Sequence, residues 1–263
     1  MTSSLSCVTW NVNSIRSRLQ HVLEFLRHHA PDILLLQELK LETNKFPYME
    51  IEELGYNCAV HGQKTYNGVA ILSKTPLEDI STDFPADEGQ ARYIEAVTTK
   101  EGHVFRVASI YVPNGQSLES DKFQYKMRFY EALQSHACAL LRYEENLILG
   151  ADYNVAYLPQ DVYDPKSADG AICYNAQERS VFQRLLNLGL YDAFRSKHPN
   201  TQAYSWWDYR GGKFQQDMGL RIDHLLLSAE AQDRLTDARI IKEERAKEKP
   251  SDHAPVWTDF ALS

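Results

Sequence analysis

The stretch from Leu147 to Asn154, Leu-Ile-Leu-Gly-Ala-Asp-Tyr-Asn, constrains the fold more than any other part of the chain. It opens as a short apolar run, which is typical of a strand buried on both faces of a sheet. Gly150 then permits either a turn or a close backbone approach. Asp152 and Asn154 follow, and in an extended chain their side chains point to the same side. The stretch therefore indicates either an ordinary polar turn or a site at the exit of a buried strand, where clefts form in α/β folds.

The chain has 263 residues, enough for one large α/β domain or two smaller ones. Because no Pro/Gly/Ser-rich linker or low-complexity tract divides it, we predict a single domain over residues 1–263. The net charge of -8 argues against a broad basic surface for nucleic acid but is compatible with a local basic rim. The four cysteines have no metal-ligand spacing, so we expect reduced thiols in a cytoplasmic protein. We expect no signal peptide, no membrane contact and a monomer.

Periodicity and breaker residues predict helices mixed with strand pairs. The predicted strands cover residues 4–13, 32–37, 58–62, 68–73, 92–99, 104–112, 221–227, 236–243 and 254–260, besides the run that starts at Leu147. The predicted helices are one that ends at Pro31 and those over residues 47–54, 120–143 and 176–188. This order indicates an α/β sandwich with mixed sheets, and the hairpins exclude a regular eightfold βα barrel.

Polar side chains stand at one end of several apolar runs. They are Asn11 and Asn13, Glu38, Tyr111 and Asn114, Asp152 and Asn154, and Asp223, while Asp252 and His253 precede the last strand. Any one of them alone could be a surface cap or a turn residue. Together they predict convergence on a single cleft.

The residue types in this set suit metal-assisted phosphate chemistry. Glu38, Asn11 and Asp252 offer hard oxygen ligands, which Mg²⁺ and Mn²⁺ prefer, whereas the His and Cys spacing of a zinc site is missing. An aspartate beside a histidine can fix its tautomer and stabilise its protonated form, and Asp223 with His253 is a candidate pair.

The remaining polar groups suit attack by water. Asp152 could orient or deprotonate a water, and Asn154 and Tyr111 could donate hydrogen bonds to a phosphoryl oxygen. Because no Ser or Cys sits in a nucleophile elbow, direct attack of water on a phosphodiester is favoured over a covalent intermediate.

Seven motifs lie along the whole chain: WNVNSIR at 10–16, LQELK at 36–40, YNGVAILS at 66–73, YVPNG at 111–115, GADYN at 150–154, GLRID at 219–223 and SDHAP at 251–255. They resemble those of the bacterial exonuclease III-type AP endonucleases, in the endonuclease/exonuclease/phosphatase superfamily. The resemblance implies a four-layer α/β sandwich, with two mixed β-sheets packed face to face and helices outside. It also implies Mg²⁺-dependent cleavage 5′ to abasic sites in double-stranded DNA, removal of 3′ blocking groups, and 3′→5′ exonuclease activity. Mn²⁺ would be a substitute for Mg²⁺.

The resemblance also implies roles for single residues. Glu38 would be the principal metal ligand, with Asn11 and Asp252 in or near the metal shell. The implied catalytic set is Asp152 on the water, Asn154 at the transition state, and Tyr111 and His253 on the phosphate, with Asp223 holding His253. Trp206 and Leu220 would line the pocket for the flipped-out abasic sugar, and Asn114 would reach the DNA backbone.

An acidic protein that binds a polyanion needs local positive potential. We therefore expect about half of the cations in loops and on helix faces to form a DNA-facing rim. The candidates are Arg16, Arg18, Lys64, Lys122, Lys126, Arg128, Arg210 and Lys213, of which we select Arg16 and Lys126. The loop that carries Cys173 borders the DNA in relatives, and we predict that this small side chain leaves room for an abasic strand.

The chain departs from the family pattern at two places. Asn13 stands where some relatives carry an acid, and Ala151 stands between Gly150 and Asp152, where many members place Asp directly after Gly. A shift by one residue would change how Asp152 approaches a phosphate. The alternatives are another phosphoesterase on this scaffold, such as a phosphoinositide phosphatase or sphingomyelinase, and a non-catalytic binding protein.

Overall fold

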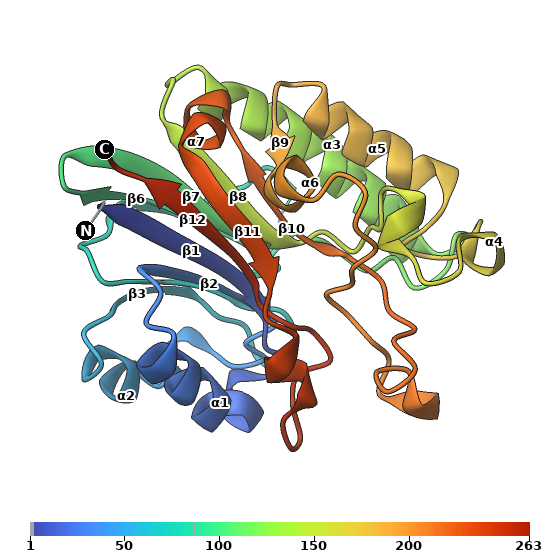
Figure 1. Cartoon of the computed structure of the whole chain (residues 1–263), viewed down its shortest axis with the longest axis horizontal. Helices are drawn as coiled ribbons and strands as arrows, with labels where there is room; N and C mark the ends of the chain where they lie inside the picture. Colours follow the sequence, from blue (N-terminus) through green and yellow to red (C-terminus); the bar gives the residue numbers. More distant parts are fainter. Residues whose placement is uncertain (1–2, 87) are drawn as a thin grey trace.

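The structure is a computed structural model that describes residues 3–86 and 88–263. Two six-stranded mixed sheets pack face to face, with helices on both outer faces (Figure 1). The first sheet has the order β11 (Leu235–Ile240), β12 (Val256–Ala261), β1 (Ser4–Asn11), β2 (Ile33–Gln37), β4 (Val69–Ser73) and β3 (Asn57–His61). The second has the order β5 (Glu78–Ser81), β6 (Tyr93–Lys100), β7 (His103–Tyr111), β8 (Asn146–Asp152), β10 (Asp223–Leu227) and β9 (Tyr191–Asp192). The predicted four-layer sandwich is confirmed.

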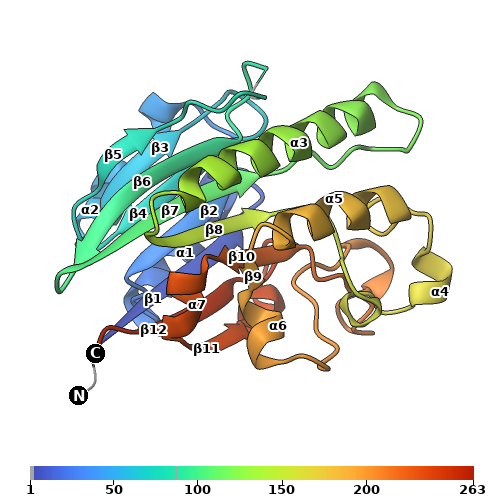
Figure 2. The same cartoon turned by 90° about the horizontal axis from the view of Figure 1, so that it is seen from above.

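The helices divide between the two outer faces. Apolar residues of α1 (Ile15–His28) and α2 (Tyr48–Glu52) pack on the outer face of the first sheet. Those of α3 (Asp121–Leu141) and α5 (Ala176–Leu186) pack on the second sheet, where the two helices lie side by side (Figure 2). Ser120 caps α3 by accepting the backbone N–H of Phe123, as a serine before an apolar-periodic run predicts. Among residues 3–86 and 88–263, no helix has the length and apolar character needed to cross a membrane.

The continuous apolar runs are explained by burial on both faces of each sheet. All residues of β2 are buried: Ile33 and Leu35 face the second sheet, and Leu34 and Leu36 face the outer helices. Burying each such side chain contributes about 1.5–3 kcal/mol. The core between the sheets stops at the carboxyl ends of the parallel strand pairs, which leaves polar side chains at that edge.

Gly150 lies inside β8, so the turn alternative for this residue is wrong. The strand pairs in unbroken register through Asp152, which lies opposite Tyr111 of β7 and Asp223 of β10. A Cβ atom at Gly150 would lie 2.4 Å from Leu35 Cδ1 of the first sheet, so the glycine permits close approach of the sheets. The chain turns later, at Asn154, which has a left-handed φ of 51°.

The same register answers the question raised by Ala151. Its side chain packs in the cluster beneath α3 and α5, and its neighbour Asp152 faces the other sheet. The strand therefore reaches Asp152 without a bulge at Ala151.

Several short elements have no clear signal in the sequence. They are α4 (Pro165–Ala168), α6 (Ala193–Lys197), α7 (Ala229–Arg234), β5 and β9. Each has too few residues for a hydrophobic period to be recognised in the sequence, so tertiary contacts determine whether it forms.

Candidate active site

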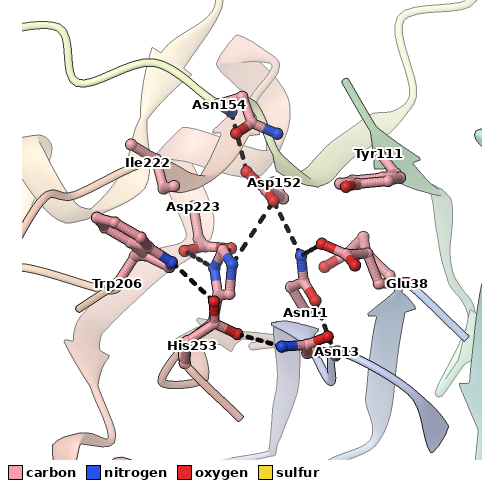
Figure 3. Close-up of polar contacts among 12 residues, drawn as sticks. Asn11, Asn13, Glu38, Tyr111, Asp152, Asn154, Trp206, Ile222, Asp223 and His253 are labelled. Carbon is pink, nitrogen blue, oxygen red and sulfur yellow. Dashed lines mark hydrogen bonds and ion pairs between the residues drawn. The ribbon is translucent and has the colours of Figure 1, made fainter. Parts of the chain in front are cut away.

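The polar strand ends converge on one pocket at the edge where the two sheets meet (Figure 3). The carboxyl ends of β1 and β2, which are parallel, bring Asn11 and Glu38 there, and those of β7 and β8 bring Tyr111 and Asp152. The cavity has a volume of about 410 Å³, within the usual range for small-ligand sites. Its lining residues are Glu38, Tyr111, Asn114, Asp152, Asn154, Ile172, Cys173, Trp206, Leu220, Ile222, Asp252 and His253.

One amide holds two carboxylates from different sheets. Asn11 Nδ2 donates to Glu38 Oε1 at 2.8 Å and to Asp152 Oδ2 at 2.9 Å. Glu38 adopts a left-handed φ of 54° directly after β2, and its other oxygen lies 2.8 Å from Lys40 Nζ. Asn11 thus sets the distance between two acids that would otherwise repel each other.

His253 and Asp223 form the predicted pair. Asp223 Oδ2 lies 2.9 Å from His253 Nδ1 and accepts a second hydrogen bond of 2.6 Å from Ser205 Oγ. Burial opposes a charge on the imidazole, but Asp223 and Asp152 outweigh it and raise the pKa of His253 to about 10. Protonated His253 therefore presents Nε2–H toward the pocket, 3.8 Å from Asp152 Oδ2.

Asp152 has the environment of a proton acceptor that works near neutral pH. Burial, together with the nearby charges of Asp223 and Glu38, raises its pKa to about 7, although His253 and the Asn11 hydrogen bond act in the opposite direction. Its Oδ1 accepts the backbone N–H of Asn154 at 2.9 Å. A buried carboxylate with this pKa can hold or release a proton at physiological pH.

Tyr111 lies across the pocket from His253. Burial and the charge of Glu38 raise its pKa well above the ordinary value, so its hydroxyl remains protonated. Arg92 lies over the ring at 4.8 Å and helps to fix its plane. A protonated phenol in this position can donate to a phosphate oxygen.

Asp252 is held by two N–H donors. Its Oδ1 accepts from Asn13 Nδ2 at 2.9 Å and its Oδ2 from Trp206 Nε1 at 3.0 Å. An acid at position 13 could not make the first of these bonds, so the asparagine here is matched to Asp252. The pair ties the loop after β1 to the wall of the pocket.

A backbone bridge between Trp206 and Leu220 positions the side chains of the apolar wall of the pocket. Trp206 and Leu220 exchange two backbone hydrogen bonds of 2.9 Å, and Trp206 also pairs with His253. Ile172 and Ile222 complete the wall, and sequence reasoning missed both. Ile222 follows Leu220 at the strand period of two, which could have identified it. Ile172 carries no such signal.

The two asparagines on the opposite wall bond to each other. Asn114 Nδ2 donates to Asn154 Oδ1 at 2.9 Å, and Asn154 Nδ2 donates to Val112 O at 2.9 Å. The Asn114 amide also lies 3.7 Å from the thiol of Cys173. Asn114 therefore orients Asn154 within the pocket.

The predicted basic rim divides into surface and interior residues. Arg16 is exposed and lines a second, basic pocket with Lys40, Lys45 and Lys64. The prediction that Lys126 faces DNA is wrong, because its side chain is 0% exposed and pairs with Glu178 inside the protein.

The chemistry of the acidic centre fits a divalent cation. Glu38 and Asp152 offer carboxylate oxygens that lie within 4.8 Å of each other, beside protonated His253. Four carboxylates surround the pocket, those of Glu38, Asp152, Asp223 and Asp252, and Lys40 and His253 offset them only in part. Hard oxygen donors with excess negative charge suit Mg²⁺ or Mn²⁺.

Comparisons with known proteins identify the family and relatives of this chain. The profile of the Endonuclease/Exonuclease/phosphatase family matches residues 8–253. The chain is 35% identical to Exodeoxyribonuclease III of Haemophilus influenzae, over 96% of this chain and 98% of that protein. The structure of the 3′ phosphatase NExo (D146N) from Neisseria, bound to a product DNA hairpin, superposes with a TM-score of 0.94 at 42% identity, covering 98% of this chain and 100% of that chain. An AP endonuclease from Archaeoglobus fulgidus gives 0.92 at 35% identity, covering 97% and 99%.

Proposed function

The chain belongs to the Endonuclease/Exonuclease/phosphatase family, and on that premise we propose that it is a Mg²⁺-dependent DNA repair nuclease that cleaves the phosphodiester 5′ to abasic sites. We propose that it also removes 3′ blocking groups and degrades duplex DNA from the 3′ end. The observation that carries the proposal is the convergence of Glu38, Asp152 and the Asp223–His253 pair in one pocket with an apolar wall.

Glu38, Asn11 and Asp252 would hold the metal, with Asp152 and His253 beside it. When bound, Mg²⁺ would supply positive charge that stabilises the phosphate as negative charge develops on it. The contact between Asn11 and Glu38, the short distance from Glu38 to Asp152, and the presence of Asp252 in the same pocket support this placement.

The protein's own groups divide the remaining work. Asp152 orients a water molecule and accepts its proton as the water oxygen attacks phosphorus. The bond from phosphorus to the 3′ oxygen of the preceding nucleotide breaks, and that oxygen takes a proton from solvent and leaves as a 3′ hydroxyl. Protonated His253, held by Asp223, contacts a phosphate oxygen, and Tyr111 and Asn154 donate further hydrogen bonds to the developing charge. The pKa of Asp152, about 7, supports its role as the proton acceptor.

The apolar wall of Trp206, Leu220 and Ile222 supports selection of an abasic sugar. An abasic nucleotide has no base to stack or pair, so extruding it costs less than flipping a normal one. Arg16 and the lysines of the basic pocket would hold the strand through its phosphates.

A narrower function, in which the enzyme processes only 3′ ends, is favoured by one observation. The Neisseria structure at 42% identity is described as a 3′ phosphatase. Both functions use the same phosphate chemistry, and they differ in whether an internal abasic strand fits the pocket.

We further propose a cytoplasmic monomer that acts as a single domain on double-stranded DNA with abasic sites or 3′ blocked ends. The four cysteines, all of which are free, including the exposed Cys138, support a reducing compartment such as the cytoplasm. Gel filtration with light scattering would test the monomer, which should elute near its mass of 30.2 kDa.

The first prediction tests metal-dependent incision. A duplex with one internal abasic-site analogue should be cut 5′ to the lesion with Mg²⁺, remain intact with EDTA, and be cut again when Mn²⁺ is added in excess. A second duplex with a 3′-phosphate at a nick is the parallel substrate. Absence of Mg²⁺-dependent incision would refute the endonuclease proposal, and removal of the 3′-phosphate alone would assign the narrower function.

The second prediction concerns Cys173, which lines the pocket and has a left-handed φ of 69°. Cys173→Trp should lower incision at an internal abasic site about 10-fold or more, because the indole would fill the space of the strand. Cys173→Gly, which suits this backbone conformation, should retain incision. Cys138→Trp on the exposed face of α3 is the matched control. Unchanged incision by Cys173→Trp would show that the strand does not pass this residue.

A further inference from the structure

Lys126 is a buried cation whose hydrogen bonds join three separate segments. Its side chain and that of Glu178 are both 0% exposed, and the two form an ion pair. The helices that carry them, α3 and α5, lie side by side (Figure 2). Lys126 Nζ also donates to the backbone oxygen of Asn114 at 3.1 Å and to that of Asn154 at 2.8 Å. An ammonium group has three hydrogens, so all of them have acceptors.

The backbone at Gly115 leaves room for the side chain of Lys126. Gly115 has a φ of +96°, and a Cβ atom there would lie 3.2 Å from Lys126 Cδ. Buried ion pairs are weak evidence of stabilisation, because desolvating two charges offsets most of their attraction. A fully buried lysine with a glycine beside its stem therefore calls for a role besides stability.

Two of the three acceptors belong to residues that line the active site. Asn154 N–H donates to Asp152 Oδ1 at 2.9 Å, so the backbone held by Lys126 also holds the carboxylate proposed to accept the proton. Asn114 in turn donates its side-chain amide to Asn154 Oδ1. Displacement of either backbone oxygen would move the side chains on this wall.

The third acceptor extends the same network to the loop that carries Cys173. Glu178 Oε2 accepts from Asn175 Nδ2 at 2.6 Å, and Asn175 Oδ1 accepts the backbone N–H of Glu178 at 3.0 Å. Cys173 O accepts from the backbone N–H of Ala156, two residues after Asn154. Lys126 is thus bonded directly to the segments of Asn114 and Asn154, and through Glu178 and Asn175 to the loop that carries Cys173.

We infer that Lys126 is a positioning residue: through Asn114 O, Asn154 O and Glu178 it fixes the wall of the pocket that orients Asp152 and Asn154. Only the kinetic test of this inference depends on the proposed function. It replaces the DNA contact that the sequence predicts for this lysine.

The third prediction separates positioning from stability with paired variants. Lys126→Met and Glu178→Gln alone each leave a buried charge unpaired and should lower the melting temperature by roughly 5 °C or more. The double variant Lys126→Met/Glu178→Gln removes both charges and should recover most of that loss. Its kcat should nevertheless remain about 10-fold or more below wild type, with KM within about 3-fold, because Asn114 O and Asn154 O still lack their donor. If kcat recovers together with the melting temperature, the ion pair is merely structural and the inference is wrong.

A second readout needs no substrate. In the double variant, hydrogen exchange of the Asn154 amide, followed by NMR, should be about 10-fold faster, because its bond to Asp152 is less well held. Lys122→Met, on the exposed side of α3, is the control for melting and exchange and should change neither. Unchanged Asn154 exchange would overturn the positioning role even if the wild-type protein cleaved no DNA. Faster exchange in a protein without nuclease activity would uphold this role and refute the proposed function.

Discussion

Asp152→Asn is expected to lower single-turnover incision by roughly 10²- to 10⁴-fold while the protein stays folded, the range for loss of a positioned general base. The amide has nearly the same shape as the carboxylate, but it cannot accept a proton from water. It also cannot accept from both Asn11 Nδ2 and Asn154 N–H, which the two carboxylate oxygens do at 2.9 Å each. The loss should therefore appear in kcat more than in substrate affinity.

The Asp152→Asn substitution should lower activity without lowering the stability of the fold. Because burial and two neighbouring acids raise the pKa of Asp152, its charge opposes folding at neutral pH, and a neutral amide removes that penalty. This gain opposes the cost of the one buried donor that the amide cannot accept, so the melting temperature measured in EDTA should stay close to that of the wild type. Asp233→Asn, on the exposed side of α7, is the control and should change neither quantity. Turnover within tenfold of wild type would exclude Asp152 as the proton acceptor.

The sequence could predict the strand ends because their pattern is local. A buried strand must be apolar on both faces, so the change to polar residues after Leu36 and Leu149 marks the edge of the core. The pairing of Asp252 with Asn13 could not be predicted, because it joins residues 239 positions apart. Such a contact depends on where β12 and β1 lie side by side, which no local period encodes.

The position of Lys126 could have been predicted and was missed. It lies three residues after Phe123 and four before Tyr130, both of which are buried, so it falls on the apolar stripe of α3. The expectation that a lysine on a helix is solvated outweighed that periodicity. Buried Glu178 is the ion-pair partner that makes a lysine tolerable at position 126. It lies on α5, and nothing in the sequence indicates that this helix packs beside α3.

Arg221→Met is expected to lower the free energy of unfolding by about 3–5 kcal/mol, the cost of breaking a buried ion pair from one side. Arg221 is 0% exposed and donates to Asp161 Oδ1 at 2.7 Å and to Asp192 Oδ2 at 2.7 Å. Methionine would fill much of the space but remove the cation that the two buried carboxylates share, leaving Asp161 with Arg195 and Asp192 with His224. Because Arg221 stands between Leu220 and Ile222, the change should also loosen the apolar wall of the pocket.

The pH dependence of this loss identifies its cause. Burial opposes the charges on Asp161 and Asp192, but the Arg221 guanidinium outweighs it and lowers the pKa of both carboxyl groups. Their contribution is therefore fully present above the unfolded-state pKa of about 4 and is lost as the pH falls through the lower folded-state values. In Arg221→Met the two acids lose their shared cation and keep only Arg195 and His224 beside them, so the variant should be least stable relative to wild type at pH 7. The difference should shrink towards about pH 2.5, below the unfolded-state pKa of the carboxyl groups. Urea unfolding at both pH values measures this, with the surface variant Arg210→Met as the control, for which about 1 kcal/mol or less is expected. An equal loss at both pH values would mean that lost packing, and not the two buried aspartates, causes the destabilisation.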